Sequence, residues 1–175
     1  MALTKAVCSN HGWMLSQVKF YTGIPSKADD AKWNAFWSKK LLAMSRQGVQ
    51  TFSRQLRYRE KVHQLPGGGT FTFTAGEEKG IDVRLAIDVI RMAHRNAYDV
   101  ALIFSQDQDL SEVAEEIRQI SSEQKRWIKA VSAYPAGPKA SNHKGIYKTD
   151  WCPIDREMYD KCVDPFDYFP KKVTV

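Results

Sequence analysis

Three aspartates are the side chains of this sequence that are best placed to do chemistry together. Asp107 and Asp109 are separated by one residue and follow the most apolar segment of the chain, and Asp82 lies at the start of the preceding predicted helix. In open parallel sheets, sites form just beyond the carboxyl ends of the strands. Clustered carboxylates repel one another unless a cation neutralises them, and their oxygens suit Mg²⁺ or Mn²⁺. One hypothesis is therefore a divalent metal site formed by Asp82, Asp107 and Asp109.

The same aspartates could instead have structural roles. Asp109-Leu110-Ser111-Glu112 fits a capping box, with Asp109 as the N-cap and Glu112 at the third helical position. Asp82 could stabilise the start of its own helix through the helix macrodipole. From the residues alone, capping and metal binding both remain open.

A basic segment lies at the end of a predicted strand and contains Arg54, Arg57, Tyr58, Arg59 and Lys61. Cations contact phosphates and an aromatic ring can stack on a base, so this combination suits single-stranded RNA. A basic edge strand that resists edge-to-edge pairing would have the same composition. Both interpretations remain open.

The chain alternates between strand and helix patterns, which predicts an α/β fold with a mainly parallel central sheet. Residues 99–105 form the near-continuous apolar run of a strand that is covered on both faces. A helix pattern over 110–121 and a strand pattern over 126–132 follow, and this spacing indicates a right-handed βαβ crossover. The other predicted elements are helices at 1–12, 31–47 and 81–95, strands at 13–21 and 49–59, and a hairpin arm at 70–74.

The composition is that of an ordinary globular protein. A chain of 175 residues fits one domain, and 43% hydrophobic with 26% charged residues allows a buried core. The net charge of +6 favours polyanionic partners. No apolar run reaches the length of a membrane span, and the first residues lack the pattern of a signal peptide. Because no such run is present, we expect no membrane partner. Three scattered cysteines are typical of reduced thiols, so we expect a cytoplasmic protein.

Two segments resemble the NYN domain, a PIN-like nuclease group that includes LabA-like bacterial proteins. One segment is the helix start Lys79-Gly80-Ile81-Asp82. The other runs from Tyr98-Asp99 through the apolar strand into Ser105-Gln106-Asp107-Gln108-Asp109. The resemblance extends from about residue 13 to residue 132. It implies a Rossmann-like, three-layer α/β/α sandwich, with a single domain over residues 1–175 and residues 135–175 as a C-terminal extension packed on it.

The resemblance also implies a metal-dependent ribonuclease that hydrolyses the phosphodiester bonds of RNA. By position, Asp82, Asp107 and Asp109 match the family's catalytic acids, which hold Mg²⁺ or Mn²⁺. The residues expected to contact the RNA are Lys79 and Ser105 at the scissile phosphate and Arg54, Arg57 and Arg59 farther along the strand.

The sequence departs from the family pattern at its front. The family's sheet begins with a strand that ends Asp-x-x-Asn and supplies a central metal ligand, whereas this sequence opens in the helix expected after that strand. A shortened sequence, a mis-assigned start and a degenerate member all fit this pattern. The alternative function is a catalytically weakened RNA-binding or assembly module that keeps the fold. A manganese-assisted transferase is a third hypothesis. Because a missing strand would expose apolar sheet surface, a homodimer is a further expectation.

Overall fold

The computed structural model describes residues 1–138, 140 and 143–170. Within these residues the chain forms two compact units. The first unit is built from Gln17–Ile81 and the described residues from Pro165 onward, and the second from Ala2–Ser16 and Asp82–Asp164. In this part of the chain, no helix is both long enough and apolar enough to cross a bilayer.

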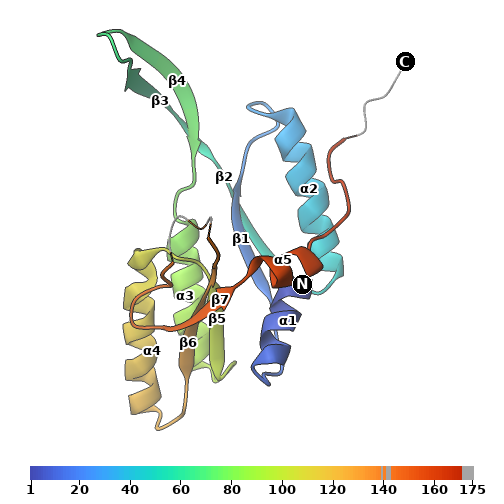
Figure 1. Cartoon of the computed structure of the whole chain (residues 1–175), viewed down its shortest axis with the longest axis vertical. Helices are drawn as coiled ribbons and strands as arrows, with labels where there is room; N and C mark the ends of the chain where they lie inside the picture. Colours follow the sequence, from blue (N-terminus) through green and yellow to red (C-terminus); the bar gives the residue numbers. More distant parts are fainter. Residues whose placement is uncertain (139, 141–142, 171–175) are drawn as a thin grey trace. The chain divides into compact units, whose positions relative to one another are not determined.

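The first unit combines a pair of parallel strands with a long antiparallel hairpin (Figure 1). Its elements are β1 (Lys19–Ile24), α2 (Ala31–Arg46), β2 (Gln50–Gln55), β3 (Arg57–Gln64) and β4 (Thr70–Glu77). Helix α2 connects the parallel strands β1 and β2, and β3 and β4 form the hairpin. Leu56 alone separates β2 from β3, so the sequence pattern of the predicted strand 49–59 runs across two strands with different partners.

Helix α2 is fixed by a cap at its start and by aromatic contacts along one face. The Asp30 carboxylate accepts the backbone N–H of Trp33 at 2.9 Å, which satisfies one free amide of the first turn. The Phe36 ring lies 4.7 Å from the Phe169 ring and 6.0 Å from the Tyr168 ring, centroid to centroid. The amphipathic pattern that predicts this helix therefore reflects packing of aromatic rings in the first unit.

The second unit is built around one parallel sheet in the order β5, β6, β7. Its elements are α1 (Ala2–Asn10), all but the first residue of α3 (Ile81–His94), β5 (Val100–Phe104), the short 3₁₀ helix η1 (Gln108–Leu110), α4 (Ser111–Glu123), β6 (Lys129–Pro135), β7 (Asp150–Ile154) and α5 (Arg156–Lys161). The predicted succession of strand, helix and strand over residues 99–132 corresponds to β5, α4 and β6.

Neighbouring residues of β6 belong to two different hydrophobic clusters. Ala130 packs in one cluster with Ile117 of α4, whereas Val131 packs in the other with Val7 of α1 and Ile154 of β7. Apolar side chains therefore cover both faces of the sheet, which explains why its strands have nearly continuous apolar sequences. The prediction of an α/β fold with parallel strands is confirmed.

Several predicted boundaries and assignments differ from the structure, and three of them have a local cause. Strand β1 begins at Lys19 and not at residue 13, because the Trp13 N–H bonds back to the Cys8 carbonyl at 2.9 Å and the pairing with β2 starts at Lys19. Strand β6 begins at Lys129 and not at residue 126, because the Arg126 backbone N–H bonds back to the Ser121 carbonyl at 3.1 Å and the pairing with β5 starts at Lys129. Residues 150–154 form β7, where the sequence predicted only an extension. This strand was not predicted because it contains Pro153, and a proline argues against a strand assignment.

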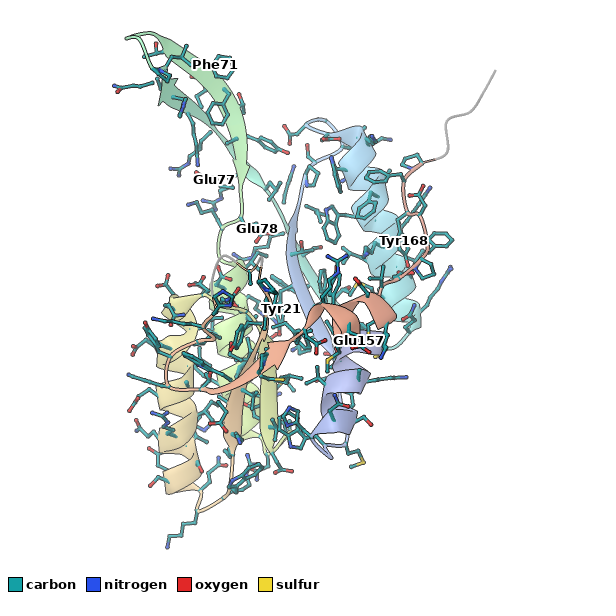
Figure 2. The ribbon with its side chains drawn as sticks, in the orientation of Figure 1. Tyr21, Phe71, Glu77, Glu78, Glu157 and Tyr168 are labelled. Atoms are coloured by element: carbon teal, nitrogen blue, oxygen red, sulfur yellow. The ribbon has the colours of Figure 1, made fainter. Side chains whose placement is uncertain are left out.

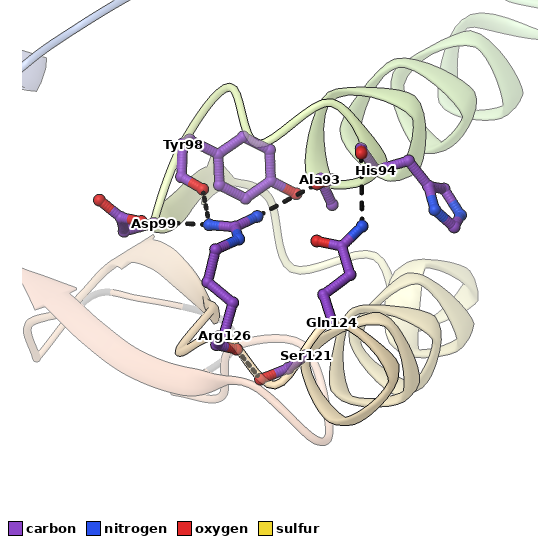
Figure 3. Close-up of polar contacts among 7 residues, drawn as sticks. All are labelled: Ala93, His94, Tyr98, Asp99, Ser121, Gln124 and Arg126. Atoms are coloured by element: carbon purple, nitrogen blue, oxygen red, sulfur yellow. Dashed lines mark hydrogen bonds and ion pairs between the residues drawn. The ribbon is translucent and has the colours of Figure 1, made fainter.

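Arg126 links the end of α3 to the start of β5 (Figure 3). Its Nη1 donates to the Tyr98 carbonyl at 2.8 Å and its Nη2 to the Ala93 carbonyl at 3.1 Å. Nη1 also lies 3.1 Å from the Asp99 carboxylate. The Tyr98 hydroxyl donates to the Val89 carbonyl at 2.9 Å, and burial raises the pKa of this phenol. The guanidinium thus supplies a donor to a carbonyl near the end of α3, where helical partners run out.

Replacing Arg126 with Met should lower the free energy of unfolding by about 2 to 3 kcal/mol, because two carbonyls lose a charged donor. Arg95→Met is the matched control, since Arg95 is exposed just after the same helix, and its effect should stay within about 0.5 kcal/mol. Urea denaturation followed by circular dichroism measures both. Equal destabilisation by the two variants would contradict the assigned role.

Candidate functional site

The loop after β5 holds Asp107 and Asp109 at the surface of the second unit. Asp107 Oδ1 accepts the backbone N–H of Asp109 at 3.0 Å and caps η1, and both side chains are exposed. The predicted capping box with Asp109 as the N-cap is wrong. Leu110 occupies the N-cap position of α4, because η1 forms an extra turn between β5 and that helix.

Two glutamine side chains fix this loop against the segment at residues 144–147. Gln108 Nε2 donates to the Gly145 carbonyl at 3.1 Å, and Gln108 Oε1 accepts the Tyr147 backbone N–H at 3.0 Å. Gln106 Nε2 donates to the Lys144 carbonyl at 2.8 Å. The glutamines beside Asp107 therefore have a structural function.

Buried Ser132 supports the same loop from within the sheet. Its hydroxyl donates to the Ser105 carbonyl at 2.7 Å and accepts the Ile146 backbone N–H at 3.0 Å. The Ser105 hydroxyl accepts the Asp107 backbone N–H at 3.1 Å. A Cβ on Gly145 would lie 2.8 Å from Ser132 Oγ, so only glycine fits at this position. The predicted contact of Ser105 with a phosphate stays a prediction.

The predicted acidic residues do not form one three-ligand site. Asp82 is exposed in the first turn of α3, while the buried acid of that helix is Asp88, whose Oδ1 lies 3.2 Å from Arg84 Nε. Over the residues that the structure describes, no three His, Cys, Asp or Glu side chains lie together so that they could hold a metal ion. The three expected donors are thus not gathered as one set in the described residues, and binding of Mg²⁺ or Mn²⁺ stays a prediction.

An open hollow of about 890 Å³ lies beyond the carboxyl ends of the strands in the second unit. Phe104 of β5, Tyr134 of β6 and Ile154 of β7 contribute to its mainly apolar wall, and Ser105 and Gln106 line it from the start of the aspartate loop. This is the place where parallel sheets commonly form sites. Its lining, however, is not the carboxylate cluster that the sequence predicted.

The hairpin of the first unit has one side that we call the basic–aromatic face. Directly opposed residues of an antiparallel pair project to the same side, and side chains alternate along each strand. The opposed pairs on this side are Arg57–Glu77, Arg59–Ala75, Lys61–Phe73 and His63–Phe71. The register thus places the basic residues of β3 on the same side as the phenylalanines of β4.

The rings on this face are available to a partner. Phe71 and Phe73 are 58% and 41% exposed, and their rings stack with centroids 6.0 Å apart and planes inclined by 14°. Figure 2 shows Phe71 on the hairpin and Glu77 near its base. The Glu77 carboxylate lies 2.8 Å from Lys61 Nζ and 3.3 Å from Lys79 Nζ. These two ammonium groups hold the pKa of Glu77 below its usual value.

Not every predicted RNA-binding residue lies on this face. Tyr58 projects from the other side of the hairpin, over Gly76. Arg54 belongs to β2 and lies over the Phe52 ring, 5.6 Å from the ring centroid. The backbone at position 80 has a φ of +71°, a conformation that favours glycine, and Arg54 Nη1 lies 2.7 Å from where a Cβ would stand.

The structure therefore brings Arg57, Arg59 and Lys61 of the predicted basic segment together and adds Phe71 and Phe73, which the predicted site did not include. The turn at residues 65–69 was the signal that could have identified them. When residues are paired symmetrically about the centre of this turn, odd-numbered residues of β3 lie opposite odd-numbered residues of β4. The side chains of these pairs project to the same side of the hairpin.

Comparison with known proteins gives one family assignment. The chain matches the model of the NYN domain over residues 11–138. No curated protein matches it significantly. Among solved structures, the ribokinase from Giardia lamblia is similar, with a TM-score of 0.41 and 13% identity over 77% of this chain and 41% of that one. This chain spans less than half of the ribokinase.

Proposed function

The chain belongs to the NYN domain family, and on this premise we propose that it binds single-stranded RNA through the basic–aromatic face of the β3–β4 hairpin. The main support is that cations and exposed aromatic rings from two strands share one side of the hairpin. Cationic side chains track a phosphate backbone, and aromatic rings stack on bases of any sequence.

The spacing of these side chains suits an extended nucleic-acid strand. Arg57, Arg59 and Lys61 recur at every second residue of β3, which separates neighbouring cations by about 7 Å. Phe71 and Phe73 lie on the adjacent strand, about 5 Å away across the hairpin. A single strand lying along the hairpin would have its phosphates over β3 and its bases over β4.

The exposed rings favour single-stranded over double-stranded RNA. Ring stacking needs bases whose faces are accessible, and bases within an A-form duplex are already stacked on one another. Phe71 and Phe73 would therefore contribute little to the binding of a duplex, which could use only the cations. We expect weaker binding of a duplex of the same length.

A second candidate function is hydrolysis of RNA, because the NYN family is of nuclease type. The exposed carboxylates of Asp107 and Asp109, directly after β5, favour it. A bound Mg²⁺ or Mn²⁺ would offset charge in such a reaction. Since Asp82, Asp107 and Asp109 do not gather into a three-ligand site, we place RNA binding first.

We propose that this function is exerted in the cytoplasm. Cys8, Cys152 and Cys162 are free thiols, the state that a reducing compartment maintains. Burial raises the pKa of Cys8 and Cys152, so neither thiol is activated as a nucleophile.

Truncation of a stacked ring tests RNA binding. Phe73→Ala should weaken binding of a single-stranded RNA about 5- to 150-fold, the loss expected for one base–ring stack. Val62→Ala is the matched control, because Val62 is 65% exposed on the other side of the hairpin. Fluorescence anisotropy measures both variants, and Phe73→Tyr should restore most of the affinity. Equal losses for Phe73→Ala and Val62→Ala would contradict the proposal.

Incubation of the protein with single-stranded RNA, in Mn²⁺ or in EDTA, tests the order of the two functions. We expect the RNA to be bound and to stay intact in both conditions. Asp107→Asn should not alter this result, since Asn Oδ1 can still accept the Asp109 N–H. Cleavage that EDTA abolishes and that Asp107→Asn removes would instead establish the second candidate.

A further inference from the structure

The outer edge of β4 is a part of the hairpin that RNA binding does not occupy. Among the described residues, β4 is paired with β3 in a sheet of two strands, and its residues are exposed or half-buried. A hairpin of two strands is marginally stable in water, and three or more strands are usually needed. The hairpin also exposes apolar side chains, namely Val62, Leu65, Phe71 and Phe73. An additional strand would therefore stabilise it.

The two edges of the hairpin differ in charge. Strand β3 carries Arg57, Arg59, Glu60 and Lys61, and charged side chains on an edge strand discourage further pairing. Strand β4 has neither a charged residue nor a proline from Thr70 to Gly76. The edge that is open to pairing is therefore that of β4.

The direction of the backbone groups on this edge follows from the turn. The Leu65 N–H donates to the Gly69 carbonyl at 2.8 Å, so this opposed pair is hydrogen-bonded. Hydrogen-bonded and non-hydrogen-bonded pairs alternate along an antiparallel ladder. Phe71 and Phe73 therefore direct their N–H and C=O groups toward β3, whereas Thr70, Thr72 and Thr74 direct theirs outward.

The sequence of this edge is the same in both directions, Thr70-Phe71-Thr72-Phe73-Thr74. We propose that β4 pairs in antiparallel orientation with β4 of a second copy of this chain, about a two-fold axis at Thr72. This register places Thr72 opposite Thr72, Thr70 opposite Thr74, and Phe71 opposite Phe73.

Each pair in this register is of a favourable kind. The threonines form the hydrogen-bonded pairs, because their backbone groups point outward. The phenylalanines form the non-hydrogen-bonded pairs, in which opposed side chains lie closest. Aromatic pairs and threonine pairs both stabilise antiparallel strands. An interface that uses the same patch twice closes after two copies.

The pairing would extend the basic–aromatic face. Because opposed residues project to the same side, both copies of this face lie on one side of a sheet in the order β3, β4, β4, β3. Phenylalanine rings from both copies form its centre, and the cations of the two β3 strands flank them. Each copy thereby contributes rings to a shared surface, and the pairing itself does not require RNA.

Sedimentation velocity over a range of protein concentrations tests the pairing with three variants. Thr72→Pro removes an outward N–H and leaves the β3–β4 ladder intact, and Thr72→Lys sets two like charges opposite each other at the axis. Val62→Lys adds the same charge directly across the hairpin, on the β3 edge. We expect the wild type and Val62→Lys to form a concentration-dependent dimer, and both Thr72 variants to stay monomeric with unchanged circular dichroism.

A wild type that is monomeric up to its solubility limit would overturn the proposal. Dimerisation that persists in both Thr72 variants would overturn it as well, because another surface would then be responsible. RNA binding is measured separately on the same variants. A monomeric Thr72→Lys variant that still binds RNA would leave the proposed function intact, and a dimer that does not bind RNA would leave the pairing intact.

Discussion

The pairing register between β3 and β4 is the constraint on which the proposed RNA-binding surface depends. Arg57 lies opposite Glu77, and Gln64 lies opposite Thr70. A shift of one residue would turn the rings of β4 to the side away from the cations of β3. The turn at residues 65–69 sets this register through the hydrogen bond from Leu65 to Gly69. A local turn therefore determines whether cations and rings act on the same partner.

The two units differ in how much support they give to their polar side chains. In the second unit, Gln108, Gln106 and Ser132 hold the aspartate loop in place, and Asp107 is engaged as a cap. In the first unit, the cations of the hairpin are exposed, and exposed ion pairs contribute only about 0 to 1 kcal/mol each. Useful affinity for RNA then requires several phosphate contacts together with stacking, which contributes about 1 to 3 kcal/mol per base.

The sequence could predict the elements whose pattern is local, but not contacts that depend on how distant elements meet. The apolar run at residues 99–105 identified β5, and the aromatic periodicity identified α2. The cap role of Asp107 was missed because η1 is too short to have a pattern of its own. The gathering of Asp82 with Asp107 and Asp109 was a tertiary hypothesis, and spacing along the chain cannot establish proximity. To predict that Arg59 and Phe73 lie on the same side of the hairpin, the pairing register is needed as well as the composition of the two strands.

The dependence of RNA affinity on salt is the sharpest test of the proposed RNA-binding surface, because it counts the phosphates that the cations neutralise. For single strands, the logarithm of the association constant falls with the logarithm of salt concentration by about 0.7 per phosphate contact. We predict that Arg59→Gln reduces the magnitude of this slope by about 0.7, and that Arg95→Gln, remote in sequence from the hairpin, leaves it unchanged. An unchanged slope in Arg59→Gln, or equal changes in both variants, would contradict the assignment of the RNA-binding surface to the hairpin.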